Sequence, residues 1–182
     1  MQPIGPLMHE HRLIERLLHL VEREVREVEA GSRPDSAFLD QAVDFFRSYA
    51  DRCHHGKEED ILFRELAKKP LSADEKRVLD ELVDEHVQGR ALVRAIFEAN
   101  HAVARCENAA PAETLLPLLR KLCAFYPVHI AKEDKHFFFP VMRHFSRVEM
   151  DAMLKEFEEF DRQLVHEKYA AVVNDREAAL KA

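Results

Sequence analysis

Apolar residues recur every three or four positions through most of the chain, which is the spacing that an amphipathic α-helix requires. In the first segment, Leu7, Ile14, Leu17, Leu18 and Val21 follow this spacing. Proline, glycine and helix-capping residues divide the pattern into five helices, which we expect at about residues 6–30, 35–69, 72–106, 112–145 and 147–175. Only 4 glycines in 182 residues leave little material for hairpin turns. The pattern therefore predicts an all-α protein.

Long helices joined by short breaks are typical of an up-down-up-down four-helix bundle. We expect the bundle at about residues 7–145, with an additional C-terminal helix at about 147–175. The length, with 47% hydrophobic and 34% charged side chains, suits a single domain over residues 1–182. The apolar stripe of the fifth helix, which includes Met153 and Phe157, is expected to pack on its own bundle. A homodimer surface and a lid over the bundle end are the alternatives.

Two polar motifs on the apolar faces each occur twice, and the two copies of each motif are separated by the same number of residues. Glu-His at 10–11 recurs at 85–86, and His-x-x-Lys-Glu at 54–58 recurs at 129–133. The offset between the copies is the same for both motifs, and we call it the repeat offset. It maps the first helical hairpin of the bundle onto the second. We therefore expect the matched residues to meet near the middle of the bundle, across a pseudo-twofold axis.

The repeated residues are the ligand types of a site for two metal ions. Residues four apart lie on one face of a helix, so each His can reach the same small volume as the Glu that follows it. A carboxylate can bridge two cations, whereas an imidazole gives one nitrogen to one cation. Mixed nitrogen and oxygen ligands with open positions favour iron or manganese over structural zinc. The predicted ligands are His11, His54, Glu58, His86, His129 and Glu133.

A single His-x-x-x-Glu pair on a helix is most often a solvated ion pair. Here two such pairs share one offset with two Glu-His pairs, and apolar residues flank all four motifs. Burying four imidazoles and two carboxylates in such surroundings would be very costly without a metal. The metal site is therefore the preferred interpretation.

Some neighbouring residues offer competing assignments. His55 and Glu59 form a second His-x-x-x-Glu register, but the repeat offset places Ile130 opposite His55, so this register is not doubled. We expect His55 to be solvated or to support a ligand, with a role as ligand the weaker alternative. Glu10 and Glu85 are expected to be ordinary carboxylates of a helix face.

Four further residues are expected around the ligands: Glu15, Arg90, Tyr126 and Asp134. Glu15 and Arg90 are matched by the repeat offset and are expected to pair at one end of the site, with Glu15 as an extra ligand the alternative. An arginine that faces metal ions needs such a partner. If Arg90 is only partly paired, it would attract an anionic ligand. Tyr126 is a candidate hydrogen-bond donor or an ordinary core tyrosine, and the offset favours Glu133 over Asp134 as the ligand.

Four blocks of the chain resemble the hemerythrin HHE cation-binding family over about residues 7–145: LMHEHRLIERLL, CHHGKEEDILF, EHVQGR and HIAKEDKHFFFP. The resemblance implies a four-helix bundle that holds a non-haem di-iron centre, with the six residues above as ligands. Oxygen-carrying hemerythrins have a second histidine where this chain has Arg90, and an aspartate ligand where Asp134 stands. The chain is more similar to the bacterial branch with four His and two Glu, and this disfavours simple oxygen storage.

The expected cofactor is two iron ions, Fe2+ or Fe3+, bridged by Glu and by an oxo or hydroxo group. The expected function is to bind or sense O2, NO or a related oxidant, so the expected partner is a small diatomic or peroxo ligand. No dinucleotide loop, CxxC or haem motif is present, so turnover would need an external redox partner. Alternatives are enzyme-like NO or peroxide reduction, iron delivery for iron–sulfur cluster repair, and an iron-responsive interaction module. We favour a binding or sensing protein over an enzyme.

Charge and cysteine content indicate which kinds of partner and which cellular compartment to expect. A net charge of −7 and a pI near 5.9 disfavour nucleic acid. We expect neither a membrane span nor a secretory signal, because no long apolar stretch and no basic leader is present. Cys53, Cys106 and Cys123 are odd in number and lie in apolar helical segments, so we expect reduced thiols and a cytoplasmic protein.

Overall fold

A computed structural model describes residues 2–105, 110–162 and 165–180, and within these residues the regular structure is helical, with no strand. The elements in chain order are α1 (Ile4–Glu29), α2 (Ser36–Phe45), η1 (Phe46–His55), η2 (Glu58–Phe63), α3 (Arg64–Leu66), α4 (Ala73–Arg105), α5 (Ala110–Lys132), η3 (Glu133–Phe137), α6 (Phe138–Met142), α7 (Arg147–Asp161) and α8 (Val165–Ala179). The elements named η are π-helical segments. None of the described helices is both long and apolar enough to cross a membrane.

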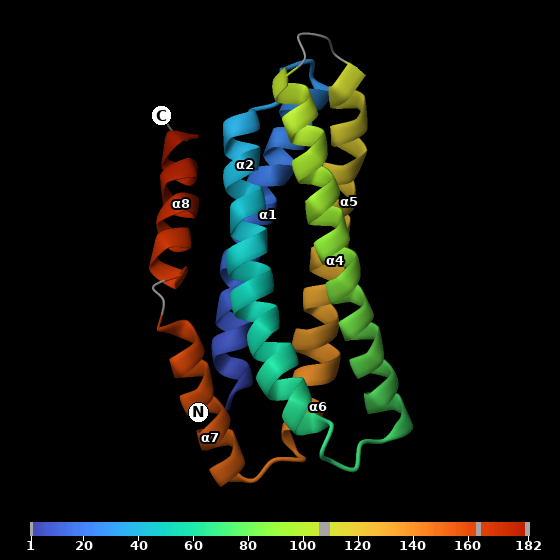
Figure 1. Cartoon of the computed structure of the whole chain (residues 1–182), viewed down its shortest axis with the longest axis vertical. Helices are drawn as coiled ribbons and strands as arrows, with labels where there is room; N and C mark the ends of the chain where they lie inside the picture. Colours follow the sequence, from blue (N-terminus) through green and yellow to red (C-terminus); the bar gives the residue numbers. More distant parts are fainter. Residues whose placement is uncertain (1, 106–109, 163–164, 181–182) are drawn as a thin grey trace.

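Four long helices run up, down, up and down and form the predicted bundle, as Figure 1 shows. The first and third are α1 and α4. The second joins α2, η1, η2 and α3, and the fourth joins α5, η3 and α6. α5 packs on both α1 and α4, and α2 packs on α4. The predicted all-α bundle with an additional C-terminal helical segment is therefore confirmed. Cys106 and residues 108–109 of the expected break before the fourth helix lie outside the described residues.

The C-terminal segment, expected as one helix, consists of the two helices α7 and α8. They lie one after the other along the flank of the bundle (Figure 1). Ser146 and Glu149 form a capping box at the start of α7, in which each side chain bonds the backbone of the other residue. Met153 and Phe157 of α7 are each 2% exposed within an apolar cluster that includes Leu62 of η2. The apolar stripe of α7 therefore packs on its own bundle.

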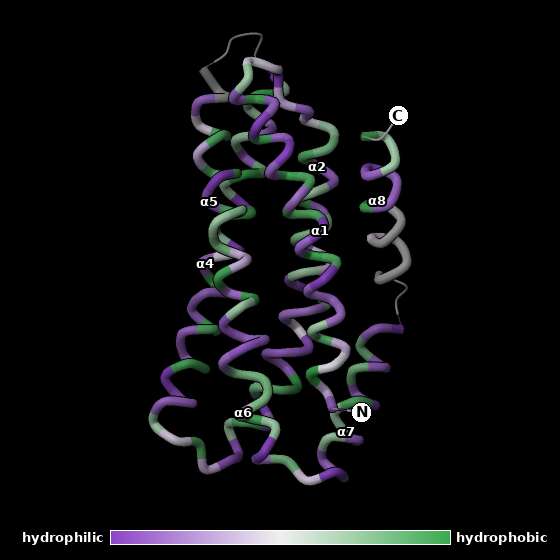
Figure 2. The backbone as a smooth tube through the Cα atoms, turned by 180° about the vertical axis from the view of Figure 1, so that it is seen from behind, coloured by the Kyte–Doolittle hydropathy of each residue, from purple (hydrophilic) through white to green (hydrophobic). Residues whose placement is uncertain are grey.

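The interior of the bundle contains two apolar clusters. One cluster includes Leu17, Val93 and Leu122, and the other includes Leu7 and Phe137. Green apolar stretches alternate with purple polar ones along each helix of the bundle in Figure 2. Between the two clusters every helix of the bundle contributes buried polar side chains. Such a layer is costly unless its polar groups are satisfied.

The second helix is wound more widely than an α-helix along most of its length. Its buried side chains recur every four residues, in one row from Phe45 to Ile61 and a neighbouring row from Phe46 to Leu66. An α-helix has 3.6 residues per turn, so it would carry such rows gradually round to the surface. The π-helical hydrogen bonding of η1 and η2 keeps both rows inside, and π-segments are frequent at functional sites. Two adjacent residues, His54 and His55, are buried together as a result.

Candidate metal centre

The six predicted ligands meet in the polar layer between the two apolar clusters. They come from all four helices of the bundle, and none is more than 2% exposed. The Nε2 atoms of the four histidines and all four glutamate oxygens are buried without a hydrogen bond to any residue that the structure describes. The six residues are His11 of α1, His54 of η1, Glu58 of η2, His86 of α4, His129 of α5 and Glu133 of η3.

Each glutamate lies between a histidine of the first helical hairpin and a histidine of the second. Oε1 of Glu58 lies 3.4 Å from Nε2 of His54, and its Oε2 lies 3.4 Å from Nε2 of His86. Oε2 of Glu133 lies 3.2 Å from Nε2 of His11, and its Oε1 lies 3.4 Å from Nε2 of His129. One oxygen of each carboxylate is thus available to each of two cations, which is the arrangement of a bridging ligand.

The other ring nitrogen of each histidine meets a carboxylate. Because a carboxylate only accepts, Nδ1 of each neutral ring carries the hydrogen and Nε2 presents a lone pair to the interior. Lone pairs of imidazole and carboxylate then face one another across the centre, and a cation between them satisfies both. The four contacts are His11 to Asp134 at 2.8 Å, His54 to Glu10 at 2.9 Å, His86 to Glu59 at 2.6 Å and His129 to Glu85 at 2.9 Å.

Each of these four outer carboxylates is in turn paired with a cation. The pairs are Asp134 with Arg12, Glu10 with Lys57, Glu59 with Arg90, and Glu85 with Lys132. Each carboxylate that holds a histidine therefore has a cation beside it. Glu58 and Glu133 have no lysine or arginine partner among the described residues. Their two negative charges remain for metal ions to neutralise.

Without metal, protons have to take the place of the ions. Burial, followed by the neighbouring Glu133 carboxylate, raises the pKa of Glu58 well above its usual range. Burial alone would disfavour a charged His11, yet the carboxylates of Asp134 and Glu133 raise its pKa to about 9. Burial and the nearby charge of His11 lower the pKa of His54 to about 4. Metal binding at this site must therefore displace protons.

Comparison with known proteins agrees with this geometry. The model of the hemerythrin HHE cation binding domain matches residues 2–138. The chain belongs to this family. Uncharacterized proteins of Mycobacterium bovis and Mycobacterium tuberculosis are 26% identical to it over 176 residues, which is 96% of this chain and 67% of theirs. No solved structure matches the chain. The fold and the His and Glu cluster of this hemerythrin domain therefore indicate metal binding, while its named relatives supply no activity.

The residues expected around the ligands of the hemerythrin domain have different partners from those predicted. The prediction that Glu15 and Arg90 pair was wrong: Glu15 binds Arg12 at 2.8 Å, whereas Arg90 binds Asp51 at 2.7 Å and Glu59 at 2.6 Å. The α-helical register carries Glu15 past the site toward the surface, where it pairs with Arg12. Arg90 is neutralised by two carboxylates that the sequence analysis did not connect with it.

Tyr126 and Asp134 lie beside the predicted ligands. Asp134 bonds the ring of His11, and Tyr126 is 2% exposed, with its ring 6.4 Å from that of His129. No hydrogen bond links the Tyr126 hydroxyl to a described ligand of the site.

Sequence reasoning missed three of the four carboxylates that hold the histidines. Glu10 and Glu85 were expected on an ordinary helix face, and this was wrong: each bonds a ligand ring and a lysine. Glu59 was considered only as a competing ligand. A signal was present, since the repeat offset matches Glu10 with Glu85 and also Glu59 with Asp134. The repeat thus includes the supporting carboxylates as well as the ligands.

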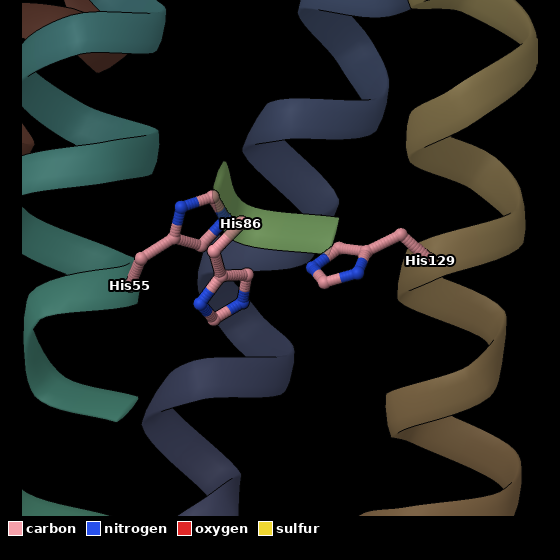
Figure 3. A group of neighbouring side chains, drawn as sticks. All are labelled: His55, His86 and His129. Atoms are coloured by element: carbon pink, nitrogen blue, oxygen red, sulfur yellow. The ribbon is translucent and has the colours of Figure 1, made fainter. Parts of the chain in front are cut away.

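His55 was expected to be solvated or to support a ligand, and the first of these was wrong. Its side chain is 2% exposed, and its ring stacks on that of His86 with centroids 3.9 Å apart. Figure 3 shows His55, His86 and His129 projecting toward one another from three helices. A cavity of about 230 Å³ adjoins His55. Its lining is Phe46, Arg47, Asp51, His55, Arg90, Val93, Arg94 and Tyr126.

Proposed function

We propose that this hemerythrin domain binds two iron ions and uses them to bind or sense O2, NO or a related oxidant. The observation that carries the proposal is the ring of buried donor atoms without partners, in which two carboxylates each face both halves of the site. Ligands of mixed nitrogen and oxygen type with open positions suit iron or manganese better than structural zinc. Two such ions would supply electrons to a small ligand when they are bound.

The side chains of the domain would contribute orientation, charge and exclusion of water. The outer carboxylates hold each Nδ1–H, so that every Nε2 is directed inward and made more basic. The apolar clusters on either side, including Leu7 and Leu17, separate the centre from bulk water. A small uncharged molecule crosses such packing more readily than a hydrated anion does. These features support a gas or a small oxidant as the ligand.

The partner and the compartment belong to the same proposal. We propose a cytoplasmic protein with an external redox partner, without nucleic acid or membrane as partners. The thiols of Cys53 and Cys123 are free, and burial raises the pKa of each to about 12, so neither is a reactive thiolate. Neither cysteine therefore offers the domain an electron store of its own.

Metal analysis and optical spectra test the proposal. The protein as isolated is expected to hold two iron ions, and the reduced protein is expected to change its spectrum on exposure to air or to NO. His54→Ala should lose iron, whereas the matched change at an exposed histidine, His136→Ala, should retain both ions. Two ions retained in His54→Ala would contradict the ligand assignment. Absence of iron in the wild type would contradict the function.

An iron-responsive interaction module is a second candidate, favoured by one contact. Asp161 at the end of α7 accepts hydrogen bonds from the Lys57 ammonium at 2.7 and 2.9 Å, and Lys57 also bonds Glu10, the partner of His54. Asp161, Glu10 and Cys53 gather closely, but the ammonium already serves as the cation of that group. A continuous chain of polar contacts thus connects the metal centre to the C-terminal segment.

A further inference from the structure

The donor atoms of the centre form two groups, one for each ion. The first group contains two histidines and both bridging glutamates. The second contains three histidines, His55, His86 and His129, whose ligand atoms all lie within 4.8 Å of one another. Figure 3 shows these three rings converging from η1, α4 and α5. The second group has one imidazole more than the doubled motif provides.

We propose that His55 is a seventh protein ligand of the centre and binds the second ion together with His86 and His129. This inference rests on the metal site proposed above. With one oxygen from each bridging glutamate, the first ion has four protein donors and the second has five. The more open ion is then the one held by His11 and His54. An exchangeable small ligand is expected there.

His55, like the other four histidines, has a carboxylate near its Nδ1, although the distance is longer. Its Nδ1 faces a carboxylate oxygen of Asp51 at 3.5 Å, and Arg90 donates to that same oxygen at 2.7 Å. Each of the other rings also has a carboxylate at Nδ1, and a cation pairs with that carboxylate. This order of cation, carboxylate and imidazole is the support that metal-binding histidines usually have. Arg90 completes two such chains, through Glu59 to His86 and through Asp51 to His55.

A histidine with only a packing role is expected to satisfy its ring nitrogens within the protein. Nδ1 of His55 is buried and has no hydrogen-bond partner in the described part of the chain, since 3.5 Å to Asp51 is too long. The ring lies flat on that of His86 and edge-on to that of His129, with centroids 3.9 and 5.7 Å apart. His86 and His129 each direct an Nε2 lone pair into the site, because a carboxylate holds their Nδ1. A cation between these two lone pairs and one from the His55 ring would hold all three rings.

Titration of the metal-free protein with Fe2+, without oxygen and against a coloured chelator, tests the proposal. His55→Ala is expected to keep its affinity for the first ion and to lose at least about tenfold in affinity for the second. Tyr126→Phe is the matched control, because the ring of Tyr126 lies 6.5 Å from the His55 ring and lines the same cavity but is no donor in either group. Its two affinities should equal those of the wild type. Added imidazole should restore the second site of His55→Ala, which a role in packing alone would not produce.

Mössbauer spectra give a second readout. The wild type is expected to show two unequal iron signals, and His55→Ala should change only one of them. Two ions bound with unchanged affinity and unchanged signals would overturn the proposal. If His55→Ala does not fold, His55→Gln preserves the volume and undergoes the same titration. A wild type that binds no pair of ions would overturn the proposed function and this inference together, whereas two bound ions without reaction toward O2 or NO would contradict only the proposed reactivity.

Discussion

At the scale of single residues, the centre is a set of histidines held by paired carboxylates. The contact between Nδ1 and a carboxylate fixes which nitrogen of the ring is free, and it is short in all four cases, from 2.6 to 2.9 Å. A neutral acceptor in place of the carboxylate would hold the ring less firmly and would lower its basicity. The outer carboxylates should therefore influence metal affinity although they touch no metal.

Glu85→Gln should reveal this influence. Glu85 bonds both His129 and Lys132, so its neutral replacement should weaken metal binding by about 10–100-fold. Glu81→Gln is the matched control, because Glu81 also bonds Lys132, at 3.0 Å, and is not among the partners of His129. Chelator competition measures both affinities. Equal losses in the two variants would mean that the Lys132 charge, rather than the support of His129, decides the affinity.

Much of the site was predictable from residue spacing. The repeat offset selected His54 over His55 and Glu133 over Asp134 as doubled positions, and the structure brings the chosen six together. The charge partners were not predictable in the same way. Arg90 meets Asp51 and Glu59 because the second and third helices pack side by side, and no local pattern specifies that contact.

At the scale of helices, the winding of the second helix decides which side chains reach the interior. An α-helix has 3.6 residues per turn, so its adjacent residues point about 100° apart and only one of His54 and His55 would face the interior. In η1 both are buried. The local composition does not specify a π-segment. The helix type and approximate limits were therefore predictable, whereas the π-winding was not.

The C-terminal segment packs closely on this same helix. A side chain at Gly56 would place its Cβ 2.9 Å from the ring of Phe160, so the glycine lets α7 lie directly against the stretch between His54 and Glu58. Lys57 in that stretch is fully buried and bonds Asp161. Docking of α7 and the support of His54 thus depend on the same ammonium group.

Asp161→Asn tests this dependence. The loss of a charged hydrogen-bond partner for buried Lys57 should lower the free energy of unfolding by about 1.5–3 kcal/mol and expose α7 to proteases. Glu156→Gln is the matched control: Glu156 also pairs α7 with the bundle, but its partner Arg64 is exposed, so the loss should stay below about 1 kcal/mol. Denaturant unfolding and limited proteolysis, with and without metal, measure the effect. If metal loading protects α7 equally in the wild type and in Asp161→Asn, the contact does not couple the two.

At the scale of the whole molecule, the metal centre is the polar interruption of an otherwise apolar interior. The two apolar clusters supply the favourable burial, and the layer between them contains the six predicted ligands, whose inner donor atoms have no partner among the described residues. Two uncompensated carboxylates in such a place oppose folding unless protons or metal ions neutralise them. The bundle should therefore depend on its metal for part of its stability.

Removal of the metal by a chelator should accordingly lower the melting temperature of the wild type. Returning the metal at a free concentration of about a hundred times its dissociation constant should restore about 2.7 kcal/mol for each independent site. In the double variant Glu58→Gln and Glu133→Gln, both buried charges are removed at nearly constant volume. This variant should bind little metal, should melt at the same temperature with and without chelator, and should melt above the chelated wild type. Calorimetry measures the melting temperatures of both proteins with and without chelator. If the wild type melts at the same temperature in both conditions, protein contacts alone stabilise the polar layer.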